Sequence, residues 1–316
     1  MLALEIENLT KDYTVGFWRK RPVRALDGLN LQVGSGEAFG FLGPNGAGKT
    51  TTLKILMRLI YPTAGEARIL GRPLDDMQMR SRIGYLPEQP YFYDYLTARE
   101  FLVYCGAIFD LPRAEAARRA EELLERVGLT EAADKHLRKF SKGMLQRVGL
   151  AQAMINDPDV LFLDEPMSGL DPLGRREVRD LIASLRGQGK TVFFSSHVLT
   201  DVEAMCDRVA ILNRGRLIES GRLSDILKSR GAELEAVVSG VSEVTIAELR
   251  AFAVEVAPTP EGARVRLHSD REVERLLAVV HRGGGRLVSI NPVRESLEDL
   301  FVREVSGNPQ AIRAAS

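Results

Sequence analysis

The chain has 316 residues, which exceeds one typical domain and favours two. Its 43 lysine and arginine residues equal its 43 aspartate and glutamate residues, which excludes a global basic field for holding nucleic acid or an anionic membrane surface. Cys105 and Cys206 form no CxxC pair, and neither a signal peptide nor a membrane-spanning segment is expected, so the composition favours a reduced, cytoplasmic protein that does not itself cross a membrane.

The first elements are expected to be strands that lead into a glycine-rich loop. Apolar residues alternate in LALEIENL and again in LDGLNLQVGSGEAFGFL, across a Gly-Ser-Gly turn. The next segment, GPNGAGKT at residues 43–50, matches the G-x-x-x-x-G-K-[ST] pattern of a Walker A phosphate loop. KTTTLKILMRLI then has helical periodicity. Strand, glycine loop and helix form the context that a phosphate loop requires.

This loop predicts a nucleotide site. Its glycines let successive backbone N–H groups curl around a β-phosphate, and the following helix adds the positive end of its dipole. Lys49 would neutralise β- and γ-phosphate oxygens, and Thr50 would offer its hydroxyl to Mg²⁺. A plain glycine-rich turn with a solvated lysine is the alternative. The residues expected to contact the nucleotide here are Gly43, Pro44, Asn45, Gly46, Ala47, Gly48, Lys49, Thr50 and Thr51.

The middle of the chain is expected to contain a helical subdomain at about residues 97–157. RAEAARRAEELLERVGL is amphipathic and ends at Gly128. In FSKGMLQRVGLAQAM, Ser141 is expected to cap a further helix, whose start would form another anion site. DVLFLDEP and TVFFSSH are continuous apolar runs, as expected of strands buried on both faces of a parallel sheet.

Two adjacent carboxylates, Asp164 and Glu165, end the first of these buried strands. Burying both is costly unless a cation accompanies them. Their position predicts that Asp164 holds Mg²⁺ and that Glu165 polarises the attacking water. A solvent-exposed acidic strand end is the alternative.

Taken together, these motifs resemble those of the ATP-binding-cassette (ABC) family. FSKGM resembles the family's signature, SGLD resembles its D-loop with Asp171, and SSHVL resembles its switch segment with His197. The resemblance covers about residues 2–229. It implies an α/β P-loop NTPase core of the ABC type with a helical subdomain, and ATP and Mg²⁺ as the bound species.

The resemblance also implies roles for single residues. Tyr13 falls where an adenine-stacking aromatic is usual, and His197 would orient the γ-phosphate and the nucleophilic water together with Glu165. The expected catalytic residues are Lys49, Glu165 and His197, the expected Mg²⁺ contacts are Thr50, Asp164 and Glu88, and further nucleotide contacts are Tyr13, Glu88, Gln89, Ser141, Gly143 and Asp171.

Two segments depart from the family pattern. Lys142 and Met144 replace a glycine and a glutamine of the signature. In IGYLPEQP, Glu88 stands where the family's Q-loop glutamine is usual, and Gln89 is next to it. Either residue would sense metal and water, or the segment is a plain surface turn. Lys142 either reaches a γ-phosphate held by a partner subunit or points to solvent.

The resemblance implies two partners. A second ATPase subunit, identical or closely related, would pair head to tail, so that each ATP lies between the phosphate loop of one subunit and Ser141 of the other. Similarity to exporter ATPases of the drug, antibiotic and sodium efflux type implies a membrane-spanning permease, with this chain on the cytoplasmic face of the membrane. No nucleic-acid partner is expected.

The alternatives to export are a soluble ABC ATPase and an inactive nucleotide binder. A soluble ABC ATPase acting on ribosomes or nucleic acid would carry two cassettes with a charged linker, or long coiled coils, and this chain has neither. An inactive regulatory nucleotide binder is disfavoured by the intact set of Lys49, Asp164, Glu165 and His197.

Residues 232–305 are expected to form a small ferredoxin-like α+β domain, and residues 306–316 a disordered tail. The turns of this domain are TPEGA and RGGGR, and SLEDLFVREV would be its final helix. Two aromatic segments each allow two interpretations. FWRKRPVR at residues 17–24 is expected to be a solvated hairpin, with a lipid or nucleotide contact as the alternative, and PYFYDYL reads as core or as a permease contact.

Overall fold

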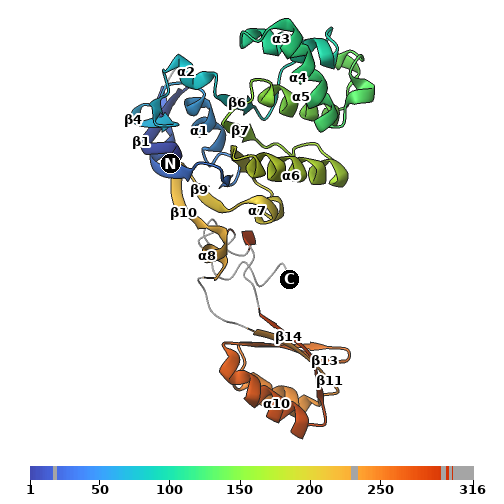
Figure 1. Ribbon diagram of the computed structural model, residues 1–316. Helices are drawn as coiled ribbons and strands as arrows, with labels where there is room; N and C mark the ends of the chain where they lie inside the picture. Colours follow the sequence, from blue (N-terminus) through green and yellow to red (C-terminus); the bar gives the residue numbers. More distant parts are fainter. Residues whose placement is uncertain (17–19, 229–233, 293–296, 299–300, 302–316) are drawn as a thin grey trace. The chain divides into compact units, whose positions relative to one another are not determined.

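The computed structural model describes residues 1–16, 20–228, 234–292, 297–298 and 301 (Figure 1). The chain divides into two compact units, Met1–Leu223 and Ser224–Ser316. Within the described residues, no helix is long and apolar enough to span a bilayer. Cys105 and Cys206 are both buried as free thiols.

A six-stranded sheet in the first unit carries the motifs. Its strand order is β10-β9-β3-β8-β7-β6, and the pairs among β9, β3, β8, β7 and β6 are all parallel. The carboxyl ends of parallel strands meet at one edge, so the loops after β3, β7 and β8 come together there. The strands are β3 (Ala38–Leu42), β6 (Ile83–Leu86), β7 (Val160–Asp164), β8 (Thr191–Ser196), β9 (Arg208–Asn213) and β10 (Arg216–Arg222).

An antiparallel sheet with the order β2-β1-β4-β5 packs into the same hydrophobic core. Apolar residues of β1 and β2 join those of β3, β7, β8 and helix α1 (Lys49–Leu56). Phe193 lies at the centre of this core, with its ring 5.6 Å from that of Phe39 and 5.7 Å from that of Phe162. The strands of this sheet are β1 (Leu2–Val15), β2 (Arg21–Gly34), β4 (Ala64–Ile69) and β5 (Arg72–Pro73).

Helices α3, α4 and α5 lie together beside the β6 edge of the sheet (Figure 1). The start of α3 is fixed by a capping box, in which Thr97 and Glu100 satisfy each other's backbone N–H groups. Of the aromatic run at residues 91–95, Phe92 is buried with its ring 5.3 Å from that of Phe101, and the three tyrosines are exposed. The helices are α2 (Met77–Arg80), α3 (Ala98–Ile108), α4 (Arg113–Arg126), α5 (Lys142–Met154), α6 (Pro172–Gly187), α7 (Leu199–Met205) and α8 (Leu223–Lys228).

The second unit has the predicted ferredoxin-like order of elements. Its four strands pair antiparallel in the order β12-β13-β11-β14, and α9 and α10 supply part of its own apolar core. Residues 17–19, much of the predicted final helix and residues 306–316 lie outside the described part of the chain. The elements are β11 (Leu234–Ser239), α9 (Glu243–Arg250), β12 (Glu255–Thr259), β13 (Gly262–Leu267), α10 (Val273–Arg282) and β14 (Arg286–Pro292).

Because the first unit has its own core, we expect a truncated chain without residues 232–316 to keep its ATP affinity within about twofold of the full chain. Titration of a fluorescent ATP analogue against both proteins measures this, with a thermal melt to establish folding. Loss of ATP binding in a folded truncation would show that the second unit contributes to the nucleotide site.

Candidate functional site

The phosphate loop follows β3 and ends in α1. Gly48 has φ 110°, and a Cβ there would lie 2.7 Å from the Ala25 carbonyl oxygen, so the position accepts only glycine. The first N–H groups of α1, which begins at Lys49, have no partner within the helix, and Gly48 has no side chain to cap them. These donors, with the positive end of the helix dipole, suit an anion such as a phosphate.

Lys49 is a buried cation, 6% exposed. Its Nζ donates to the Gly43 carbonyl at 2.7 Å and lies 3.8 Å from Glu165 Oε1. Burial lowers the pKa of Lys49, and the negative charges of Glu165, Asp164 and Glu88 oppose that effect. The ammonium is therefore held between loop carbonyls and carboxylates, at the point where phosphate oxygens would enter.

Asp164 ends β7 with no exposed surface. Its Oδ1 accepts a hydrogen bond from Ser195 Oγ at 2.5 Å. Its Oδ2 is buried and has no hydrogen-bond partner in the described part of the chain. A buried carboxylate oxygen without a donor is costly, and a cation relieves that cost, so Asp164 fits Mg²⁺. Among the described residues, no group of three or more His, Cys, Asp or Glu side chains could hold a metal ion by itself.

Glu165 turns out of the strand and into the pocket. Its backbone is left-handed, with φ 51°, a conformation that costs a non-glycine residue about 1 to 3 kcal/mol. The side chain is nearly buried, with Oε2 2.8 Å from His197 Nδ1. Lys49 and His197 thus flank the two oxygens of one carboxylate.

A pocket of about 450 Å³, a volume within the range of small-ligand sites, brings Lys49, Glu165 and His197 together. Asp164 is buried behind it and is not among its lining residues. Most of the predicted phosphate contacts, two of the predicted metal contacts and all three predicted catalytic residues line it. The lining residues are Ala25, Pro44, Asn45, Gly46, Ala47, Gly48, Lys49, Thr50, Thr51, Glu88, Glu165, Ser168 and His197. Gly43 contributes the carbonyl that accepts from Lys49 instead.

The predicted sensor and adenine contacts differ in how close they come to this pocket. Glu88 and Gln89 are both exposed, but only Glu88 lines the pocket. Tyr13 is half-buried in β1, with the Lys11 ammonium 5.3 Å from its ring centre, and it does not line the pocket either. The predicted contacts of Gln89 and Tyr13 with the nucleotide therefore stay predictions.

A second pocket, of about 840 Å³, contains Ser141, Gly143 and Asp171. Ser141 Oγ caps α5 by accepting from the Met144 N–H at 3.2 Å, as predicted. Asp171 caps α6 in the same way, accepting from the Gly174 N–H at 2.8 Å. Among the described residues, this pocket and the phosphate-loop pocket share no lining residue.

Lys142 lines the second pocket and packs on the SGLD segment. A Cβ on Gly169 would lie 2.7 Å from both Cδ and Cε of Lys142, and Gly169 has φ 75°. The positive φ favours glycine here, whereas a Cβ would displace only the flexible Lys142 side chain. The Lys142 side chain is exposed, and its ammonium makes no ion pair within the described ranges.

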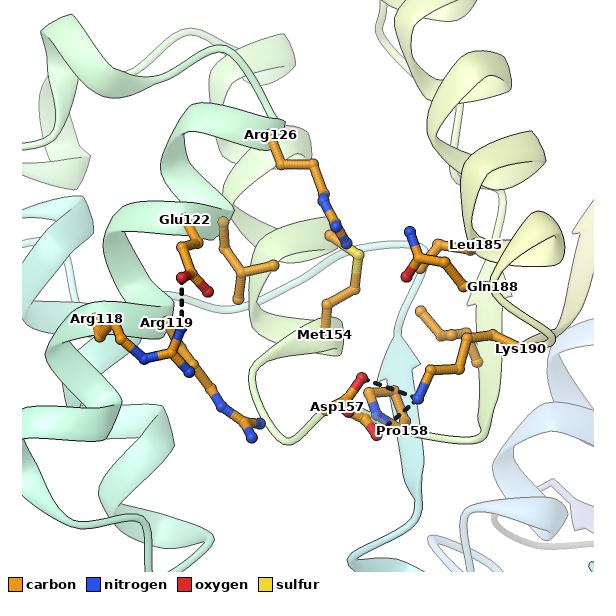
Figure 2. Close-up of a pocket in the computed structure, with 12 residues that line it drawn as sticks. Arg118, Arg119, Glu122, Arg126, Met154, Asp157, Pro158, Leu185, Gln188 and Lys190 are labelled. Carbon is orange, nitrogen blue, oxygen red and sulfur yellow. Dashed lines mark hydrogen bonds and ion pairs between the residues drawn. The ribbon is translucent and has the colours of Figure 1, made fainter.

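A third crevice, of about 220 Å³, lies between α4 and the loops that precede β7 and β8 (Figure 2). Two ion pairs lie within it: Arg118 pairs with Glu122, and Lys190 lies 2.9 Å from Asp157. No predicted site residue lines this crevice in the described structure. It is therefore separate from the phosphate site.

Sequence reasoning missed two residues that hold the acidic strand end. Ser195 Oγ accepts from the Glu165 N–H at 3.0 Å while it donates to Asp164. Gln146 Nε2 donates to the carbonyls of Glu165 and Pro166. The only sequence signals are a polar residue in the apolar run TVFFSS and a glutamine on the buried face of a helix.

Comparison with known proteins agrees with this geometry. Residues 26–168 match the family model described as ABC transporter. An ABC transporter ATP-binding protein of Synechocystis sp. is 48% identical over 96% of this chain and 84% of its own length. The bacitracin transport ATP-binding protein BcrA of Bacillus licheniformis is 36% identical over 90% of this chain and 93% of its own.

Among solved structures, a dimeric ATP-binding cassette in a post-hydrolysis state with ADP and Pi aligns with a TM-score of 0.65 and 28% identity, over 70% of this chain and 98% of that one. The range that matches the family model includes the phosphate loop and the acidic strand end, and the Synechocystis relative aligns over most of both chains. This chain belongs to the ATP-binding proteins of the ABC transporter family, whose cassettes are ATP hydrolases.

Proposed function

We propose that this chain is the ATP-hydrolysing subunit of an exporter and drives a separate, membrane-spanning permease. The observation that carries the proposal is the arrangement of Lys49, Glu165 and His197 around one phosphate-loop pocket. A relative that aligns over nearly the whole chain is named for bacitracin transport, which supports export over other uses of the cassette. The permease would select the transported substrate.

Within the pocket, each side chain has a separate task. The loop N–H groups and Lys49 bind the β- and γ-phosphates, because Lys49 is a buried cation beside these donors. Glu165 orients and polarises the attacking water, and His197 holds the Glu165 carboxylate through the 2.8 Å contact. Thr50, Asp164 and Glu88 would hold Mg²⁺, which would neutralise charge on the phosphates when bound.

A second copy of this chain, or a close paralogue, completes the site in our proposal. Ser141, Gly143 and Asp171 line a pocket of their own, so they need another subunit's nucleotide to act on. Head-to-tail pairing would place the second pocket of each subunit, which contains Ser141, over the phosphate loop of the other subunit. Tyr13 would then lie near the adenine. A related cassette is dimeric in its post-hydrolysis state, which supports this arrangement.

The C-terminal domain predicted at residues 232–305 lies within the second unit, which has its own core, and it would support dimerisation or coupling to the permease. The rival function, a soluble ABC ATPase acting on ribosomes or nucleic acid, has less support. The balanced charge of 43 basic and 43 acidic residues offers no general attraction to phosphate backbones. We therefore place the chain on the cytoplasmic face of the membrane, bound through its permease.

Co-expression with a candidate permease tests the partner. We expect the protein in the membrane fraction only when the permease is present, because no described helix can span the bilayer. Cells without the permease are the control. Stable co-purification with ribosomes, and with no membrane protein, would favour the rival function.

Lys142 tests the dimer geometry. An ammonium 4 to 6 Å from a phosphate at an effective dielectric near 20 contributes about 3 to 4 kcal/mol before desolvation and side-chain entropy are subtracted, so the net effect is smaller. Lys142→Met keeps the aliphatic stem over Gly169 and removes the charge. We expect weaker ATP-induced dimerisation with lower salt sensitivity, and unchanged ATP affinity of the monomer.

The matched control is Lys139→Met, since Lys139 is exposed nearby but does not line the second pocket. Dimerisation is titrated against salt for the wild type and both variants. Superimposable curves for the wild type and Lys142→Met would mean that the Lys142 ammonium stays in solvent.

A further inference from the structure

Gln146 is a buried polar side chain outside both predicted sites. It is 3% exposed and lies in α5, five residues after Ser141. Its Nε2 donates to the Pro166 carbonyl at 3.0 Å and to the Glu165 carbonyl at 3.3 Å. One side-chain amide of α5 therefore donates to the carbonyls of two successive residues just after β7.

The turn that Gln146 binds has a strained backbone. Glu165 has φ 51°, and such conformations persist only where the surroundings hold them in place. Two side chains from other elements do so. Ser195 binds the N–H of Glu165 from β8, and Gln146 binds its carbonyl from α5. Both peptide groups of Glu165 thus have a partner on another element, and the Ser168 N–H also donates to the Glu165 carbonyl, at 3.0 Å.

These hydrogen bonds to the Glu165 backbone determine where its carboxylate lies. The side chain reaches Lys49 at 3.8 Å and His197 at 2.8 Å only because the backbone turns at this residue. If the backbone relaxed toward an extended conformation, the carboxylate would leave those contacts. A displacement of about 1 Å in a reacting group lowers a rate by up to about 100-fold.

We propose that Gln146 is a positioning residue for Glu165. Through this residue, the rate of hydrolysis depends on the position of α5 relative to the Glu165 turn. Ser141 and Gln146 stand on one helix, about 7.5 Å apart along its axis. If Ser141 faces the nucleotide of a second subunit, α5 links that nucleotide to the Glu165 of its own subunit. The link to a second subunit's nucleotide rests on the proposed dimeric function. The contact between Gln146 and Glu165 does not.

The experiment uses the full-length protein with Gln146→Met, which keeps the length of the side chain and lacks the amide. We expect kcat to fall about 10- to 100-fold while KM, ATP affinity and the yield of ATP-induced dimer stay within about twofold. The control is Gln152→Met in the same helix, where a half-buried glutamine makes no side-chain hydrogen bond in the described structure. That variant should keep the wild-type kcat.

A second measurement separates positioning from general stability. In a Glu165→Gln background, adding Gln146→Met should cause no further loss of single-turnover rate, because Gln146 acts through the Glu165 carboxylate. An equal fractional loss in both backgrounds, or a wild-type kcat in Gln146→Met, would overturn the proposal. If Gln146→Met does not fold, Gln146→Asn keeps the amide but shortens its reach, and the same loss is expected.

Failure of this inference is distinguishable from failure of the proposed function. Absence of ATP hydrolysis in the wild type would count against the function itself. Normal wild-type hydrolysis with an undiminished kcat in the Gln146 variants would remove only the positioning role.

Discussion

The nucleotide site depends on one buried charge cluster, the Lys49 ammonium with the carboxylates of Asp164 and Glu165. None of the three would be stable alone at this depth, because an isolated buried charge is costly. Parallel pairing of β3 with β8 and of β8 with β7 brings the three together, since these strands end at the same edge of the sheet. The cluster remains incomplete: one Asp164 oxygen lacks a donor within the described structure, and the first N–H groups of α1 have no helical partner. A metal-bound phosphate would satisfy both.

Much of this arrangement is predictable from the sequence because the signals are local. The phosphate loop, the acidic strand end and the capping Ser141 are each read from a few consecutive residues, and the order of elements in the second unit follows from short periodic runs. Ser195 and Gln146 were not predicted because they act across 30 and 19 residues of sequence, on backbone groups that any residue carries. The contacts of Tyr13 and Gln89 stay predictions, since neither lines the phosphate-loop pocket.

The division of site residues between two pockets makes α5 and the SGLD segment central to coupling. Ser168 lines the phosphate-loop pocket, and the next residue, Gly169, lines the second pocket, which contains Ser141. The two pockets therefore meet at consecutive residues of the chain. The Lys142 stem packs on Gly169, and Gln146 binds the Glu165 turn from the same helix. A shift of α5 would therefore displace both the SGLD segment and the Glu165 turn. Nucleotide-driven motion of the helical subdomain is the kind of rigid-body change that such contacts transmit.

We propose that Glu165 acts on water, whereas Lys49 binds nucleotide. Steady-state turnover and ATP-induced dimerisation, measured on the same samples of Glu165→Gln and Lys49→Ala, separate these two roles. We expect Glu165→Gln to lose about 100-fold or more in turnover, to retain ATP and to accumulate dimers, while Lys49→Ala loses ATP binding and forms no dimers. Wild-type turnover in Glu165→Gln would remove Glu165 from this role.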